Sequence, residues 1–158
     1  MEISELLSPL VTDALRSMIQ HGTKSHADNK EMETLRVVVR EQLRREMRYN
    51  AELMKEQNLD INVRVLNLET DALDIAFNQG VPLSILLNRA LSEDTLRAAA
   101  ADSKKHAAHL LQLKTEAELI ERALHRIRMV KIRAKFGLGL GDVAYLRKLI
   151  VASHLSLS

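Results

Sequence analysis

The chain has 158 residues, of which 46% are hydrophobic and 28% charged, a balance typical of a folded globular protein rather than a disordered one. The absence of cysteine excludes disulfide bonds, thiolate zinc sites and cysteine nucleophiles. The formal net charge of +2 hides an asymmetry, because residues 122–148 carry +7 and the rest of the chain carries −5.

The first residues, MEISELLSPLV, lack the basic start and the apolar run of a secretory signal. No segment reaches the roughly 18 apolar residues of a membrane span. We therefore expect a cytoplasmic protein with no membrane partner. The length fits one α-helical domain over residues 1–158, with a subdivision near residue 80 as the alternative.

Apolar residues recur at helical spacing along nearly the whole chain, which has only two prolines and five glycines. A first short helix is expected over residues 8–21. Asp28 and Glu31 have the spacing of a capping box, which predicts the start of a long helix near 29–58. Residues 60–66, DINVRVL, alternate between polar and apolar and are expected to form a connector or one short edge strand.

The C-terminal half is also expected to be helical. Helices are predicted over residues 68–79 and about 82–90, and a further helical stretch begins at the capping residue Ser92. Thr115 and Glu118 form a second capping box, so the chain either restarts a helix there or continues one through it.

This last segment is expected to reach Phe136 and to stop at Gly137. The run GLGLG lacks the strand that precedes a dinucleotide loop and the Lys of a Walker loop, so we interpret it as a helix stop and an elbow. Asp142 then caps a final helix, and the serine-rich C-terminal end is expected to fray. The predicted fold is an all-α bundle of about five to seven helices.

Segments 12–22 and 70–80 share Thr, Asp, Ala, Leu and a closing Gly at the same offsets. A duplicated helical hairpin would explain this match. The common chemistry of helix starts and stops explains it almost as well, because nothing else repeats at this offset. The sequence leaves both explanations open.

The segment 122–136 presents two apolar stripes when it is drawn as a helix at about 100° per residue. A helix with two apolar faces needs two neighbours. One stripe is expected to face the core. The other, made of Met129, Ile132 and Phe136, can pack against another part of this chain or against a partner, and we favour a partner, either a second copy of the chain or another helical protein. Two basic stripes lie between them: Arg122, Arg126 and Arg133 on one side, and Arg128, Lys131 and Lys135 on the other.

An arginine ladder is expected on the long helix, where Arg36, Arg40, Arg44 and Arg48 follow at intervals of four residues. Such a ladder can hold phosphates or an acidic partner, and this binding would be sensitive to salt. The alternative is a solvated face with ion pairs to nearby acids, which are Glu33, Glu41 and Glu52.

His106 and His109 are three residues apart, a spacing that lets two histidines share a metal ion. Two lysines precede His106 and would repel a cation, and the chain has no E-x-x-H motif, so no metal and no cofactor are expected. The chain also lacks a G-x-S-x-G serine and an identifiable catalytic triad. No enzyme is predicted.

The sequence therefore predicts a non-enzymatic assembly or adaptor protein that acts through protein–protein contacts and self-associates. The alternative is a DNA- or RNA-binding accessory protein, in which the basic residues of 122–148 and the arginine ladder contact phosphates. Sequence alone does not separate an acidic protein from a nucleic acid, because both are attracted by the same positive charge.

Overall fold

The structure, a computed structural model, describes residues 30–78 and 80–158. These residues form seven helices of six or more residues and one single-turn helix, with no strand among them, which confirms the all-α bundle. The helix predicted over 8–21, the capping residue Asp28 and the segment 12–22 lie outside the described residues. The helices are α3 (Lys30–Met54), α4 (Ile61–Leu66), α5 (Asp71–Phe77), α6 (Leu83–Leu86), α7 (Glu93–Ala100), α8 (Lys104–Leu110), α9 (Glu116–Lys135) and α10 (Val143–Ser156).

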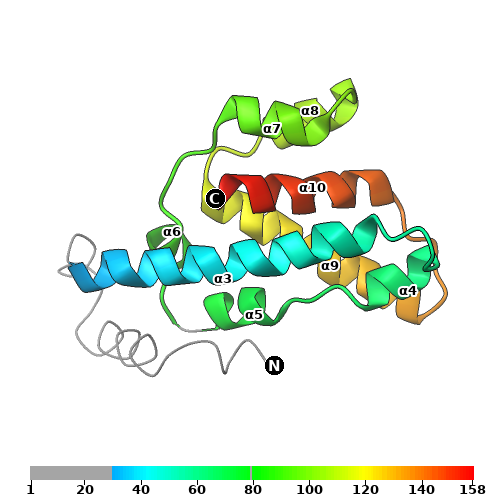
Figure 1. The fold of residues 1–158 in the computed structure, drawn as a ribbon, viewed down its shortest axis with the longest axis horizontal. Coiled ribbons are helices and arrows are strands. Elements are labelled where there is room, and N and C mark those ends of the chain that lie inside the picture. The colour runs from blue at the N-terminus through cyan, green and yellow to red at the C-terminus, as the bar shows by residue number, and fades with distance from the viewer. Residues whose placement is uncertain (1–29, 79) are drawn as a thin grey trace.

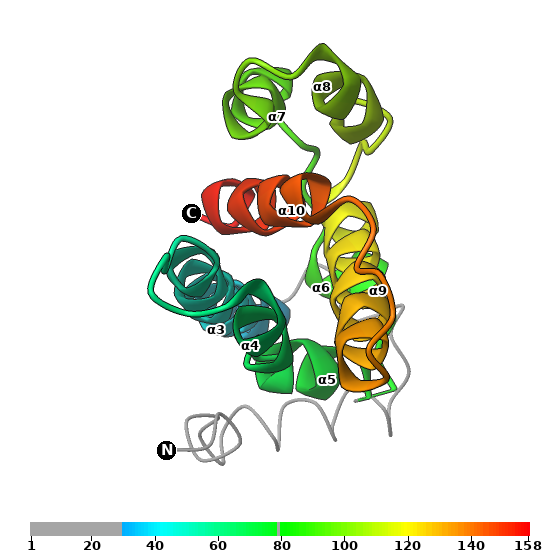
Figure 2. The same cartoon turned by 90° about the vertical axis from the view of Figure 1, so that its right-hand side faces the viewer.

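The long helices α3, α9 and α10 form the body of the bundle (Figure 1). Helix α10 packs against α3 and α9 and also against α7, so it is the central helix. The hairpin of α7 and α8 lies over α10, away from α3 (Figure 2). Helices α4 and α5 pack on α3, and α4 also contacts α9. This arrangement leaves one long side of α9 at the surface.

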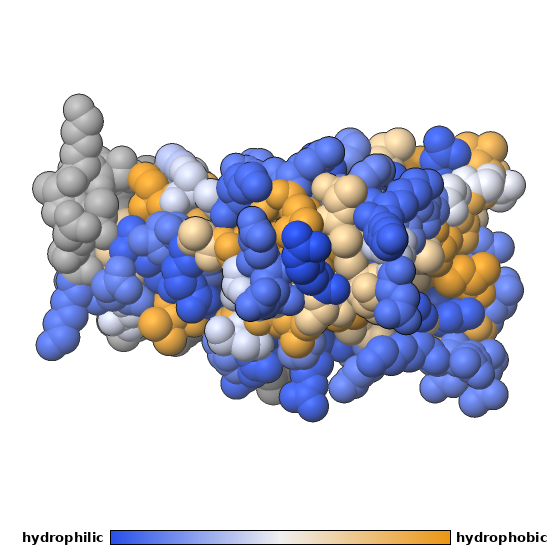
Figure 3. Space-filling model, turned by 90° about the horizontal axis from the view of Figure 1, so that it is seen from above, coloured by the Kyte–Doolittle hydropathy of each residue, from blue (hydrophilic) through white to orange (hydrophobic). Residues whose placement is uncertain are grey.

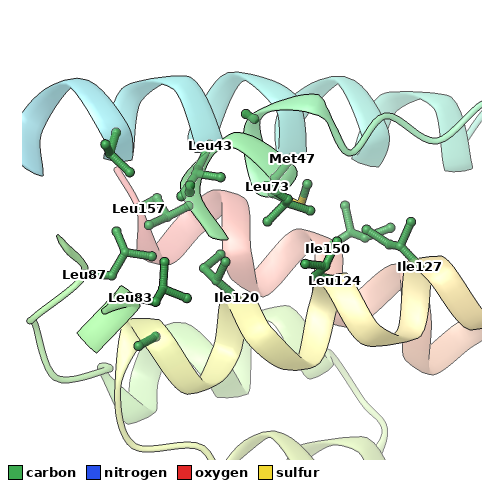
Figure 4. Packing of buried hydrophobic residues seen from close by; sticks show 14 of the residues in the cluster. Leu43, Met47, Leu73, Leu83, Leu87, Ile120, Leu124, Ile127, Ile150 and Leu157 are labelled. Atoms are coloured by element: carbon green, nitrogen blue, oxygen red, sulfur yellow. The ribbon is translucent and has the colours of Figure 1, made fainter. Parts of the chain in front are cut away.

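Buried hydrophobic side chains form two clusters. In the larger one, Leu43 and Met47 of α3 approach Ile120 of α9 and Ile150 of α10 (Figure 4). The smaller one lies between the α7–α8 hairpin and the facing sides of α9 and α10. Val151 of α10 packs against both, so α10 joins the two clusters.

The prediction of a connector or edge strand over residues 60–66 is wrong, because this segment forms the helix α4. In so short a segment, strand alternation and helical spacing overlap, and here Ile61 and Val65 form the inward side. The prediction of a frayed C-terminal end is also wrong. Helix α10 continues almost to the terminus, and Leu157 is buried in the larger cluster because the last turn packs against the core.

Helix starts follow the capping residues predicted from the sequence. Ser92, Thr115 and Asp142 each accept a hydrogen bond from the backbone N–H three residues later, at the starts of α7, α9 and α10. Ser103 does the same at the start of α8. Because Ser103 caps a second helix start, the stretch after Ser92 forms two helices, α7 and α8. The first of them ends at Ala101, whose φ is 53°.

Helix α5 is capped by a residue far away in the sequence. The side chain of Thr70 makes no capping hydrogen bond. Instead the carboxylate of Glu46 on α3, only 2% exposed, accepts the N–H of Ala72 at 2.8 Å and of Leu73 at 3.1 Å. Burial raises the pKa of the Glu46 carboxyl to about 7, although the two hydrogen bonds oppose this rise. The start of α5 thus depends on an ionisable group of α3.

The helix stop predicted at Gly137 is confirmed, with a φ of +69°, and a Cβ added there would meet nothing within 4 Å. Gly137→Ala therefore adds only backbone strain, and we expect it to lower the free energy of unfolding by about 1 kcal/mol. Gly139→Ala is the matched control, since Gly139 has equally open surroundings without a positive φ. Urea denaturation compares the two variants, and equal stabilities would contradict a strained requirement for glycine at 137.

Candidate protein-docking surface on α9

Helix α9 is held on one side by the core. The capping hydrogen bond of Thr115 fixes its first turn, and its inward residues Ala123, Ile127 and Val130 are buried on the side where α9 packs against α10 and α4. These residues belong to the first of the two apolar stripes predicted from the sequence. The core thus determines which side of α9 faces outward.

The second apolar stripe lies on the outer side of α9. Met129 is 40% exposed, Ile132 50% and Phe136 69%, and we call these three residues the exposed stripe. Leu138 of the following loop is 56% exposed, and its N–H donates to the carbonyl of Arg133, which places it beside the end of α9. Figure 3 views the molecule from the side of the α7–α8 hairpin, where hydrophobic residues are scattered among hydrophilic ones.

One side of the exposed stripe is bordered by Arg122, Arg126 and Arg133, which we call the basic edge. Together with His125 and Met129 these arginines line a surface hollow of about 290 Å³ that has no acidic residue in its lining. The guanidinium of Arg126 lies 5.3 Å from the ring centre of Tyr145, and Nη1 of Arg133 donates to the carbonyl of Gly139 at 3.1 Å. These contacts orient two of the cations without neutralising them.

The cations on the opposite side of the stripe are engaged within the chain. Arg128 forms an ion pair with Asp74 of α5, and Nζ of Lys131 donates to the carbonyl of Leu68 at 2.6 Å. Lys135 has its ammonium 5.9 Å from the ring centre of Phe136. The two basic stripes predicted from the sequence therefore differ, since the stripe with Arg128 fastens α9 to the α4–α5 region.

A second hollow, of about 420 Å³, adjoins the first, because Arg122 and His125 line both. Its lining includes the carboxylates of Glu118 and Glu121. The surface along α9 thus changes from acidic near its N-terminal end to basic and apolar near its C-terminal end.

The arginine ladder of α3 is used for contacts inside the molecule. The Nε of Arg36, a residue that is only 4% exposed, donates to the carbonyl of Ile85 at 2.8 Å. Arg40 reaches the buried carboxylate of Glu116. Arg44 and Arg48 form ion pairs within α3, with Glu41 and Glu52 respectively. The ion pairs expected from the sequence are thus present, and two of the four side chains also point into the protein.

A buried ionic cluster around Glu116 has no counterpart in the sequence interpretation. The Glu116 carboxylate accepts hydrogen bonds from Nε of Arg40 at 3.0 Å and from the backbone N–H of Arg89 at 2.8 Å. It also accepts one from the Arg89 guanidinium. Burial raises the pKa of the Glu116 carboxyl, but the hydrogen bonds from both arginines outweigh burial and leave this pKa below its ordinary value. The cluster joins α3, the chain before α7 and the start of α9.

The histidine pair is also engaged within the chain. Nε2 of His106 lies 3.0 Å from a carboxylate oxygen of Asp142, and its Nδ1 lies 2.8 Å from Nζ of Lys148. The ring of His109 stands edge-on to Tyr145. Over residues 30–78 and 80–158, no group of three or more His, Asp or Glu side chains is placed to hold a metal ion.

Comparison with models of protein families, with curated proteins and with solved structures finds no match to this chain. Among the helices that the structure describes, none combines the length and the hydrophobicity required to cross a membrane.

Proposed function

We propose that this protein is a non-enzymatic assembly or adaptor protein that docks a protein partner, another protein or a second copy, on the outer side of α9. The observation that carries the proposal is the exposed stripe of Met129, Ile132 and Phe136, opposite the side of α9 that faces the core. Burying a fully exposed side chain of this size contributes about 1.5–3 kcal/mol, and a partner can cover the 40–69% of each that remains exposed. Phe and Met are enriched in protein interfaces.

The charged residues of the chain support this proposal over nucleic-acid binding. A phosphate-binding surface requires cations that are free to face one partner. Arg40 and Arg128 already have carboxylate partners in the chain. The basic edge remains, next to an apolar stripe, and this combination is more typical of a protein interface.

A photo-crosslinking experiment in the native cells tests the proposal. The photoreactive residue p-benzoylphenylalanine replaces Phe136, and in the control it replaces Val37 on α3, which is 62% exposed and matches Phe136 in exposure. We expect a discrete protein adduct from position 136, lost on adding Ile132→Ser, and no such adduct from position 37.

Each outcome of this experiment bears on the proposal. An adduct from position 136 that Ile132→Ser abolishes supports docking on α9, whether the captured chain is another protein or a second copy. The same adducts from both positions, or an adduct with nucleic acid at 136, would overturn it. Far-UV circular dichroism of the Ile132→Ser variant checks that the helices are intact.

A further inference from the structure

The charges around the exposed stripe indicate what kind of partner fits it. The basic edge of Arg122, Arg126 and Arg133 lines the hollow of about 290 Å³, and no carboxylate lies in that lining. A partner that covers Met129, Ile132 and Phe136 also covers this hollow, because Met129 belongs to both. Cations that become covered need compensating negative charge, or their desolvation weakens binding.

A second copy of the chain packed through the same stripe does not meet this requirement. Packing two copies stripe against stripe brings basic borders together, because the stripe has Arg126 and Arg133 on one side and Lys135 on the other. The acids of α9 nearest the stripe belong to its first turns. To bring these acids against the arginines of a second copy, the two α9 helices must be shifted along each other. When Glu121 of one antiparallel copy lies opposite Arg133 of the other, Ile132 faces Arg122, so the two exposed stripes no longer contact each other.

The shape of the surface favours a helix as the partner. The exposed stripe follows intervals of three and four residues along α9, and the two adjoining hollows run beside it and share Arg122 and His125. A helix laid along another helix presents side chains at the same intervals. Its apolar stripe can cover the exposed stripe while residues on one flank reach the basic edge.

We propose, resting on the function proposed above, that α9 binds an amphipathic helix of a different protein. The apolar face of that helix covers Met129, Ile132 and Phe136, and carboxylates on one flank enter the hollow lined by the basic edge.

Designed peptides provide the test. The probe is a labelled synthetic helix of about 20 residues with a leucine stripe at helical spacing and glutamates along one flank. One control peptide has the same composition in scrambled order, and a second has lysine in place of glutamate. Labelled duplex DNA and duplex RNA are tested in parallel. Fluorescence anisotropy measures affinity for the full chain at several salt concentrations.

We expect the glutamate helix to bind at least about tenfold more tightly than either control peptide, with an affinity that falls as salt rises. Reversing the basic edge by Arg122→Glu, Arg126→Glu and Arg133→Glu should weaken this binding by about tenfold or more and should create binding to the lysine helix. A matched variant reverses three exposed cations elsewhere on the chain and should bind as the unmodified chain does, within about twofold; these are Lys55, Arg97 and Lys104.

Several results would overturn this assignment. The glutamate helix could fail to bind, or bind no better than its scrambled or lysine counterparts. The basic-edge variant could retain full affinity. Duplex binding that depends on the basic edge and exceeds peptide binding would assign these arginines to nucleic acid. A crosslink from position 136 to a second copy would support docking on α9 but would contradict an acidic helix of a different protein as the partner. The two proposals can therefore fail separately.

Discussion

Glu116→Ala is expected to lower the free energy of unfolding by about 3–5 kcal/mol, the usual cost of removing one member of a buried ion pair. The Glu116 side chain is 1% exposed and that of Arg40 12%. Without the carboxylate, Arg40 retains a nearly buried positive charge, and the backbone N–H of Arg89 loses its acceptor. Urea denaturation followed by circular dichroism measures the loss.

Two further variants separate the buried pair from the general effect of losing an acid. Glu118→Ala removes an exposed carboxylate from the same turn of α9. This carboxylate accepts a hydrogen bond from the N–H of Lys114, and its loss should cost about 1 kcal/mol or less. The double variant Arg40→Leu with Glu116→Leu also removes the nearly buried charge of Arg40 and leaves the half-exposed guanidinium of Arg89 without its carboxylate. It should therefore be more stable than Glu116→Ala. A double variant as unstable as the single one would contradict this explanation.

The sequence predicts features that depend on neighbouring residues. Ser92, Thr115 and Asp142 cap their helices as predicted, because a capping hydrogen bond spans only three residues. The two apolar stripes of α9 also follow from local periodicity, which places Ile127 inward and Ile132 outward. The exposed stripe could therefore be proposed from the sequence. The difference between its two basic borders could not, because it depends on contacts of Arg128 and Lys131 with Asp74 and Leu68, which are more than 50 residues away.

Contacts distant in sequence explain what the sequence interpretation missed. Arg40 belongs to a regular ladder and has acids nearby on α3, yet its partner is Glu116, 76 residues away. The burial of Glu46 and Asn50 could be predicted in part from the sequence, because both lie on the apolar stripe of α3 with Leu43 and Met47. Polar residues on such a stripe indicate a buried partner, but not that this partner is the backbone of the α4–α5 region.

The pH dependence of stability is expected to change when Glu46 is replaced. The pKa of its carboxyl is about 7 in the folded protein against 4.5 as the ordinary value. A folded-state pKa above the unfolded one means that the folded chain binds the proton more tightly. The resulting stabilisation is fully present below pH 4.5 and is lost as pH rises through 7. A difference of this size corresponds to about 3 kcal/mol.

Glu46→Gln removes this titration, because the amide resembles the protonated carboxyl and keeps one oxygen to accept an N–H from the start of α5. Between about pH 5 and pH 8.5 the unmodified chain should lose up to about 3 kcal/mol of unfolding free energy relative to the variant. The histidines contribute equally to both proteins, so the difference between the two curves isolates Glu46.

Glu56→Gln, at an exposed position, is the matched control and should follow the unmodified chain. If the curves of the unmodified chain and Glu46→Gln stay parallel across this range, Glu46 is ionised in the folded protein well below pH 7, and its two backbone hydrogen bonds outweigh its burial.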